Sequence, residues 1–236
     1  MKHMFKNKKI LIVVAHPDDE LLGLGATMNN LITNYSCFVR VVILGEGLTS
    51  RSDKRDLVKY KEELVIHKQN IKDAQDSIGY QELSVYDFPD NRFDTVALLD
   101  IIKIIEKEKN TFNPEIIFTH HGGDLNIDHQ RTFEAVMTAT RPMQNEKVKT
   151  IITFETPSGT EWIASTDPRK FNPNLFIEVS KENIFTKIRG MESYEFEKRK
   201  YPHPRSPEAL EIQAKRWGVA IGVEYAEAFC IIRTLI

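Results

Sequence analysis

Residues 10–20 read ILIVVAHPDDE, an apolar, mostly β-branched run joined directly to a cluster of polar residues. A run without a polar position is typical of a strand buried on both faces, as in a parallel sheet. Helical spacing of apolar residues follows at once, over residues 20–31. The stretch therefore predicts a strand, a tight loop that carries His16, Asp18 and Asp19, and a helix, which together open an α/β fold.

The same alternation continues through about residue 155. Further strands are expected at 38–44, 83–88, 116–119 and 150–154, and the helices between them at 54–78, 96–108 and 130–140. This order predicts a doubly wound, mostly parallel Rossmann-like sheet over about residues 9–155.

The rhythm weakens after the fifth strand, where a Pro/Gly/Ser-rich loop covers residues 157–173. The elements expected beyond it are a strand at 175–179, helices at 183–198 and 207–219, and a strand at 229–235. We expect this C-terminal α+β extension, about residues 156–236, to pack on the same core. Residues 1–236 would then form a single domain.

Composition narrows the function classes. The 236 residues carry 32 Lys+Arg and 34 Asp+Glu, a net charge of -2, which argues against a broadly basic nucleic-acid binder. The two cysteines, Cys37 and Cys230, lie in apolar runs and are expected to be buried thiols of a reducing compartment. No apolar run is long enough for an integral membrane segment, so we expect a cytoplasmic protein. A homo-oligomer stays open.

Four of the seven histidines follow the first and fourth strands: His16, His120, His121 and His129. Doubly wound sheets bind ligands beside the first strand, in the crevice where the strand order reverses. If the fourth strand neighbours the first, the two histidine-containing loops face each other across that crevice.

These residue types suit a catalytic zinc ion, which takes three His or Asp/Glu ligands and leaves one position for water. His16 and Asp19 lie three residues apart across a turn into a helix, so both can point at one ion, and His129 can supply the third ligand. Asp18 cannot easily share that direction and is left free to act on the metal-bound water. Iron, manganese or cobalt would also accept this donor set.

At this point the sequence resembles the PIG-L/LmbE-like zinc-dependent N-deacetylases. The likeness rests on His16-Pro17-Asp18-Asp19-Glu20 after an apolar strand and on Asp124-x-Asn126-x-Asp128-His129 after a later one. Further segments that carry it, over nearly the whole chain, are Gly45–Gly47, Phe88–Arg92, Ser158–Trp162 and Pro202–Ser206.

The resemblance implies that His16, Asp19 and His129 hold zinc, that Asp18 is the general base, and that the substrate is a small N-acetylated sugar of the glucosamine type. The chain departs from the family at Asn126, where many members have a histidine credited with stabilising the tetrahedral intermediate. An asparagine can donate a hydrogen bond but cannot become a cation.

Several further residues are candidates for the chemistry. The oxyanion that develops on the amide needs a hydrogen-bond donor, for which Asn126, Arg51 and His203 are the candidates. Asp128 either orients a ligand histidine or caps the following helix, and Asp124 has the same two readings. Three residues are candidates for binding substrate, each with a structural alternative: Arg51 binds a sugar hydroxyl or phosphate or is a solvated loop charge, Asp90 binds a sugar hydroxyl or is a turn residue, and Trp162 stacks on the sugar or is a core aromatic. The remaining histidines have simpler expectations: His203 is otherwise a surface loop residue, His120 and His121 either line the pocket or are polar loop residues, and His67 is expected on a helix surface.

Other functions are less well supported. Gly23-x-Gly25 lacks a third glycine at Met28 and lies inside the first helix, which argues against a dinucleotide-binding turn. A zinc amidase acting on a thiol-sugar conjugate or a non-sugar amide stays open, as does a non-catalytic metal-dependent sugar-binding homologue. Because a pure binder has no need of a free carboxylate beside the metal, Asp18 favours catalysis.

Overall fold

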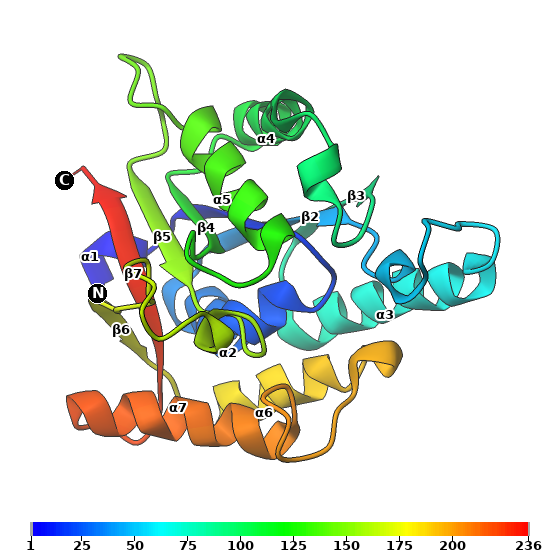
Figure 1. Cartoon of the computed structure of the whole chain (residues 1–236). Helices are drawn as coiled ribbons and strands as arrows, with labels where there is room; N and C mark the ends of the chain where they lie inside the picture. The colour runs from blue at the N-terminus through cyan, green and yellow to red at the C-terminus, as the bar shows by residue number, and fades with distance from the viewer. Residues whose placement is uncertain (1, 236) are drawn as a thin grey trace.

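The structure is a computed structural model that describes residues 2–235. Its core is one seven-stranded mixed sheet in the order β3-β2-β1-β4-β5-β7-β6 (Figure 1). The strands are β1 (Lys9–Val14), β2 (Phe38–Gly45), β3 (Glu82–Phe88), β4 (Ile116–His120), β5 (Thr150–Phe154), β6 (Leu175–Glu178) and β7 (Ala226–Thr234). The α-helices are α1 (Lys2–Phe5), α2 (Asp19–Tyr35), α3 (Lys61–Ile78), α4 (Leu98–Phe112), α5 (Ile127–Ala139), α6 (Lys181–Met191) and α7 (Pro207–Ile221).

The reversal of strand order lies where the sequence predicts it. β1 pairs in parallel with β2 on one side and with β4 on the other. The chain therefore moves from β1 outward to β3 and then crosses back to β4, which brings the loops after β1 and β4 to the same edge. The predicted α/β class, with a doubly wound and mostly parallel sheet, is confirmed.

The side chains of β1 divide between two cores because successive residues of a strand point to opposite faces. Ile10, Ile12 and Val14 join a core with α2, α3 and α6, whereas Leu11 and Val13 join a core with α4 and α5. Figure 1 shows α4 and α5 over one face of the sheet and α2 and α3 over the other. A strand buried on both faces explains the unbroken apolar run.

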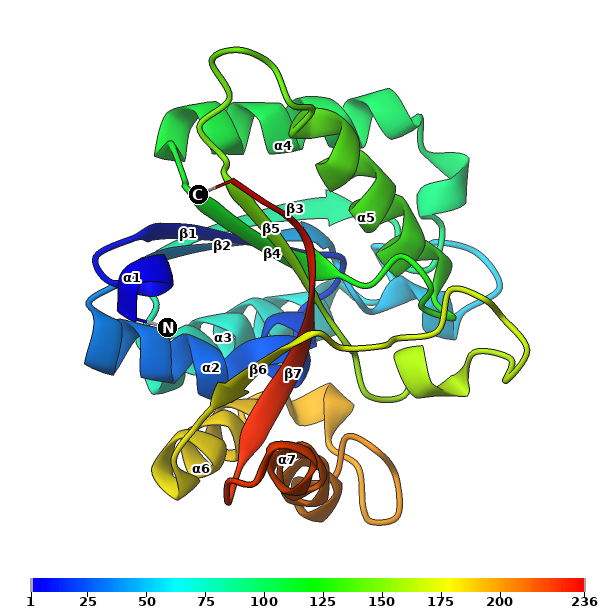
Figure 2. The same cartoon turned by 90° about the vertical axis from the view of Figure 1, so that its left-hand side faces the viewer.

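The C-terminal extension completes the same sheet. β7 pairs antiparallel with β5 and also with β6, so the sheet continues without a gap into the extension. Helices α6 and α7 lie beyond α2 on that side of the molecule (Figure 2). Lys187 of α6 makes a buried ion pair with Glu227 of β7, at 2.6 Å, and also donates to the Leu22 carbonyl of α2, at 2.8 Å. The extension is thus tied directly to the first helix.

Two predicted helices are too long. The helix expected at 54–78 begins only at Lys61, because residues 52–60 form bends and turns in which Asp56 accepts hydrogen bonds from the Val58 and Lys59 amides. The helix expected at 183–198 ends at Met191, after which the fully buried Tyr194 turns the chain inward. In both places the sequence is charged and compatible with a helix over a longer range. A local contact delays the start of the first helix, and a tertiary contact ends the second one early.

Both cysteines are buried and unpaired, as expected. No helix in the described part of the chain is both long and apolar enough to cross a membrane.

Candidate active site

The three predicted metal ligands come together at the reversal point. His16 follows β1, Asp19 begins α2, and His129 lies in the first turn of α5. Asp19 Oδ2 lies 3.5 Å from His16 Nδ1 and 3.4 Å from His129 Nε2. One donor atom from each residue lies within 4.8 Å of the other two, and all three side chains are buried. The loops after β1 and β4 therefore form one cluster of metal-binding groups.

The cluster fits a divalent metal ion. Asp19 Oδ1 and both ring nitrogens of His129 are buried and have no hydrogen-bond partner among the described residues. Burial alone would lower the pKa of His129, but Asp19 and Asp124 together raise that pKa to about 9. The surrounding carboxylates thus favour positive charge at this point, and two imidazole nitrogens with one carboxylate are a donor set that zinc accepts.

Two further carboxylates lie against the imidazole rings, Asp128 in a hydrogen bond to His16 and Asp124 in a charge pair with His129. Asp128 Oδ2 lies 2.8 Å from His16 Nε2, while its Oδ1 accepts the Phe93 amide, also at 2.8 Å. Asp124 Oδ1 lies 3.1 Å from His129 Nδ1, and its Oδ2 accepts the Thr160 hydroxyl at 2.6 Å. Carboxylates that contact the far nitrogen of a ligand histidine set its tautomer and raise its basicity.

Asp18 contacts an arginine, whereas Asp19 contacts the histidines. Its backbone has φ 97° and ψ -28°, and its carboxylate faces Arg205, whose Nη1 lies 2.7 Å from Oδ2. Burial raises the pKa of Asp18 well above its usual value, and the Arg205 guanidinium opposes that rise. Adjacent aspartates in the sequence therefore face two different partners, one facing the histidines and one facing an arginine.

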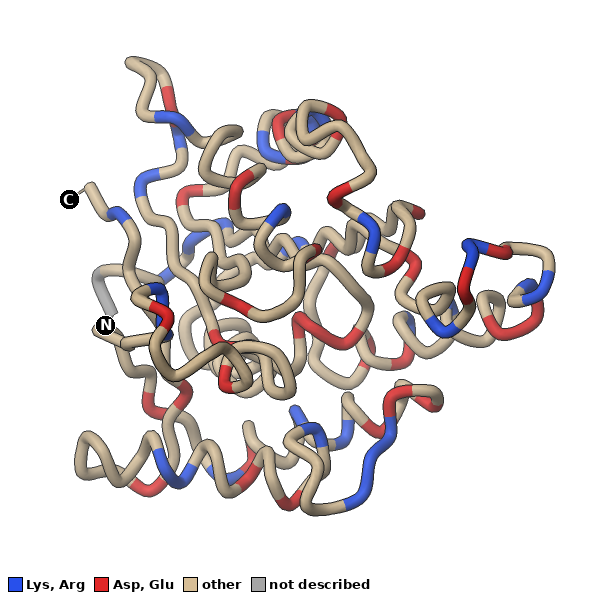
Figure 3. Tube along the Cα trace, viewed as in Figure 1, with Lys and Arg blue, Asp and Glu red and all other residues tan. Residues whose placement is uncertain are grey.

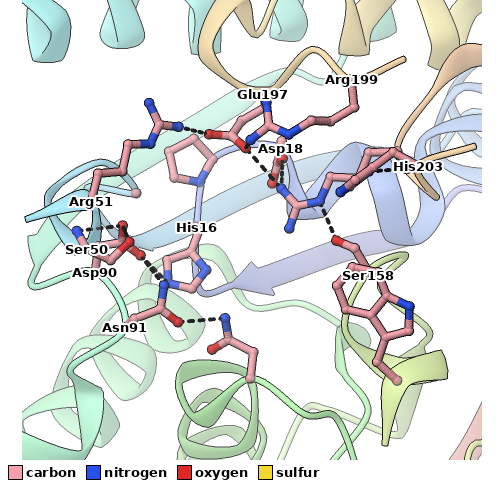
Figure 4. A pocket seen from close by; sticks show the side chains of 15 residues that line it. His16, Asp18, Ser50, Arg51, Asp90, Asn91, Ser158, Glu197, Arg199 and His203 are labelled. Atoms are coloured by element: carbon pink, nitrogen blue, oxygen red, sulfur yellow. Dashed lines mark hydrogen bonds and ion pairs between the residues drawn. The ribbon is translucent and has the colours of Figure 1, made fainter. Parts of the chain in front are cut away.

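A polar cavity of about 310 Å³ opens beside Asp18 (Figure 4). It is lined by His16 and by every predicted catalytic and substrate-binding residue, namely Asp18, Arg51, Asp90, Asn126, Trp162 and His203. These residues come from loops after β1, β2, β3, β4 and β5 and from the loop between α6 and α7. The sheet edge and the C-terminal extension thus enclose one pocket.

The individual contacts of these residues differ. Arg51 pairs with Glu197, so it is not simply a solvated loop charge. Asp90 Oδ2 accepts the Ser50 hydroxyl at 2.6 Å, which ties the loops after β2 and β3 together. Asn126 caps α5 by accepting the Asp128 amide, and its Nδ2 donates to Asn91 at 2.9 Å.

Trp162 and His203 stand at the cavity wall, with ring centroids 6.1 Å apart. Trp162 is 52% exposed, which rules out the core-aromatic reading and leaves its ring open to a ligand. His203 Nδ1 accepts the Arg205 amide at 3.2 Å, so the neutral ring carries its proton on Nε2. Burial, with Arg205 and Arg199 nearby, lowers the pKa of His203 and favours this neutral form.

Sequence reasoning missed Arg205 and its neighbours. Arg205 donates to Asp18 and to Ser158, and Glu197 joins Arg51, Arg199 and Arg205 at one carboxylate. Figure 3 shows a stretch of basic residues in the loop between α6 and α7. Arg205 lies two residues after His203 in the Pro202–Ser206 segment, which marked it as near the site. Nothing in the sequence spacing, however, links Arg205 to Asp18.

The prediction for His67 is wrong. It was expected on the helix surface, yet it is only 2% exposed and packs edge-on against Tyr194. Burial lowers the pKa of His67 to about 4.

His120 is also fully buried, stacks on His129 with ring centroids 3.9 Å apart, and accepts a hydrogen bond from the Ala15 amide at 3.0 Å. It is therefore a packing partner of the metal-binding cluster and does not line the cavity.

A family model described as GlcNAc-PI de-N-acetylase (PIG-L) matches residues 11–140, more than half of the chain and the part that contains all three predicted metal ligands. The chain belongs to the PIG-L family. Since this is a family of N-deacetylases, the protein is a hydrolase of that class, as the sequence predicts.

Individual proteins agree with the family assignment. This PIG-L family member is 27% identical to the uncharacterized deacetylase YaiS of Escherichia coli (strain K12) over 194 residues, which are 80% of this chain and 91% of the relative. Its fold is similar to that of the N,N'-diacetylchitobiose deacetylase of Pyrococcus horikoshii, with TM-score 0.74, 17% identity and coverage of 96% of this chain and 84% of the other.

The fold is also shared with GalB, the 4-carboxy-2-hydroxymuconate hydratase of Pseudomonas putida, with TM-score 0.72, 17% identity and coverage of 97% of this chain and 98% of the other. One fold thus carries two reaction classes, so the substrate and the mechanism have to be argued from the residues of the site.

Proposed function

We propose that this protein is a zinc-dependent N-deacetylase that removes the acetyl group from an amino sugar of the glucosamine type, free or as a nucleotide, lipid or glycoside conjugate. The observation that carries the proposal is Asp18, a buried carboxylate beside the His16, Asp19 and His129 cluster that faces a polar cavity. General-base catalysis gives this second carboxylate a role that metal binding alone does not require.

When bound, the metal would supply Lewis-acid polarisation of the amide oxygen and increase the acidity of water. His16, Asp19 and His129 would hold it, with Asp128 and Asp124 orienting the two rings. The remaining steps belong to the protein's own side chains.

Asp18 acts as general base and then as general acid. It takes a proton from the attacking water and returns it to the nitrogen of the leaving amine, which restores the carboxylate. Arg205, 2.7 Å from Asp18 Oδ2, fixes the carboxylate on the cavity side. Burial leaves the pKa of Asp18 well above its usual value although Arg205 opposes the rise, which suits a group that first accepts and then donates a proton.

The charge that develops on the amide oxygen needs a donor from the protein. His203 Nε2 is the best candidate, because Nδ1 already accepts a backbone amide and the ring lines the cavity. Asn126 is less suited, since its Nδ2 donates to Asn91 and its Oδ1 caps α5. Losing one such donor typically costs about 100- to 1,000-fold in rate.

The cavity wall supports a sugar as substrate. The exposed face of Trp162 offers an apolar surface for a sugar ring, and Arg51 and Asp90 offer hydrogen bonds to hydroxyl groups. Arg51 is also able to bind a phosphate on a nucleotide or lipid carrier.

The test combines metal analysis with release of acetate from N-acetylhexosamines, an N-acyl thiol-sugar conjugate and non-sugar amides. Asp18→Asn should keep the metal and lose about 100- to 10,000-fold in kcat, the usual contribution of a positioned acid or base. His129→Ala should lose the metal. Full activity of Asp18→Asn contradicts the mechanism, and metal-bound wild type that hydrolyses none of these amides supports the sugar-binding alternative.

A further inference from the structure

The backbone of Asp18 lies in a conformation that needs support. With φ 97°, this non-glycine residue occupies a region that L-residues rarely adopt. Such a conformation persists only where surrounding contacts hold it, and it is often tied to function. Its consequence here is that Asp18 faces Arg205 while Asp19 faces the histidines.

The side chain of Glu20 accepts a hydrogen bond from this turn. It is fully buried, and its Oε2 accepts the backbone amide of Asp18 at 3.1 Å. On the other side, the carbonyl of Asp18 accepts the amides of Leu21 at 3.0 Å and Leu22 at 2.9 Å. Both the amide and the carbonyl of Asp18 are therefore hydrogen-bonded. Of these three contacts, the one to Glu20 is made by a side chain and the other two are made by the backbone.

Tyr194 in turn holds Glu20. Its hydroxyl donates to Glu20 Oε1 at 2.5 Å, and the whole residue is buried. Burial and the charge of Glu20 raise the pKa of Tyr194 well above its usual value, so the hydroxyl keeps its proton. Tyr194 belongs to the C-terminal extension and lies outside the residues matched by the family model.

We propose that Tyr194 is a positioning residue for the catalytic base: through Glu20 it holds the Asp18 backbone in the conformation that directs the Asp18 carboxylate into the cavity. The proposal rests on the role of Asp18 in the proposed function. It makes the segment after α6 part of the catalytic machinery, although Tyr194 itself does not line the cavity.

Tyr80 provides a matched control. It is also a buried tyrosine, 2% exposed, but its hydroxyl has no hydrogen-bond partner among the described residues. Tyr194→Phe and Tyr80→Phe therefore remove the same atom, in one case from a hydrogen bond to Glu20 and in the other from no such contact.

The experiment compares the two variants with the wild-type, metal-loaded enzyme. Tyr194→Phe should lower kcat about tenfold with KM and metal content unchanged, because a small displacement of a catalytic group has a large effect on rate. Hydrogen exchange of the Asp18 amide should be about tenfold faster in this variant, since its acceptor is less well fixed. Tyr80→Phe should match the wild type in all four measurements.

If Tyr194→Phe does not fold, Glu20→Gln replaces it, because the amide keeps only one acceptor oxygen for the two donors. The positioning role is overturned if kcat matches that of Tyr80→Phe, or if the loss of kcat comes with a lower metal content or a higher KM. Asp18→Asn separates this result from the proposed function: an active Asp18→Asn refutes the base itself, whereas an inactive one with a normal Tyr194→Phe refutes only the positioning.

Discussion

The predicted metal-binding half of the site and the half that holds the proposed base are built in different ways. His16, Asp19 and His129 come from loops after β1 and β4, which are neighbouring strands of the parallel sheet. Arg205 and Tyr194, which hold Asp18 directly and through Glu20, come from the C-terminal extension. The sheet topology alone brings the first group together, whereas the second depends on how a later segment packs.

This difference predicts that the two halves can be disabled separately. Changes in the first half should weaken metal binding, and changes in the second should slow turnover while the metal stays bound. The variants below test that separation, beginning with the largest expected effect.

Of the three variants that follow, the largest effect is expected in the predicted metal-binding half. Asp124→Asn removes the negative charge beside His129 Nδ1, 3.1 Å away, and should weaken metal affinity about 10- to 100-fold. Titration of the metal-free protein with Zn²⁺ measures this. Asp100→Asn, an exposed acid in the first turn of α4, is the control and should bind zinc as the wild type does. Equal affinities for the two variants would argue against a role for Asp124.

A smaller effect is expected in the half that holds the base. Arg205→Gln removes the charge paired with Asp18 and should lower kcat about tenfold, the value of one hydrogen bond to a charged group. Zinc affinity should not fall, because Arg205 makes no hydrogen bond or ion pair with the three ligands and loss of its positive charge near Asp19 does not disfavour a cation. Arg216→Gln, which removes a guanidinium stacked on Trp217, is the matched control. A large loss of zinc affinity in Arg205→Gln would show that the two halves are coupled.

The smallest effect is expected at the cavity wall, at a residue proposed to contact the substrate and neither the metal nor Asp18. Trp162→Ala should raise KM about three- to fivefold with little change in kcat, as expected for the loss of one stacking contact. Because Trp162 is 52% exposed, the melting temperature should not change. Trp162→Phe should restore most of the affinity. An unchanged KM in the alanine variant would mean that the sugar lies elsewhere in the cavity.

The sequence was sufficient to predict the sheet class, the reversal at β1 and the meeting of His16, Asp19 and His129 in one cluster. Each depends on local spacing, such as the apolar run before His16 or the three residues between His16 and Asp19, together with a topology common to doubly wound sheets. The single-domain boundaries and the roles of Asn126, Arg51 and Asp90 remain predictions.

Only the tertiary structure decided which residues surround Asp18. Arg205 lies 187 residues from Asp18 in sequence and Tyr194 lies 174 from Glu20, so no periodicity or spacing connects them. The structure also shows that His67 is buried, although the sequence predicted a surface position, and that α6 ends before Tyr194. Local patterns reflect the geometry of one helix or strand, whereas contacts across the whole chain form only when distant elements pack together.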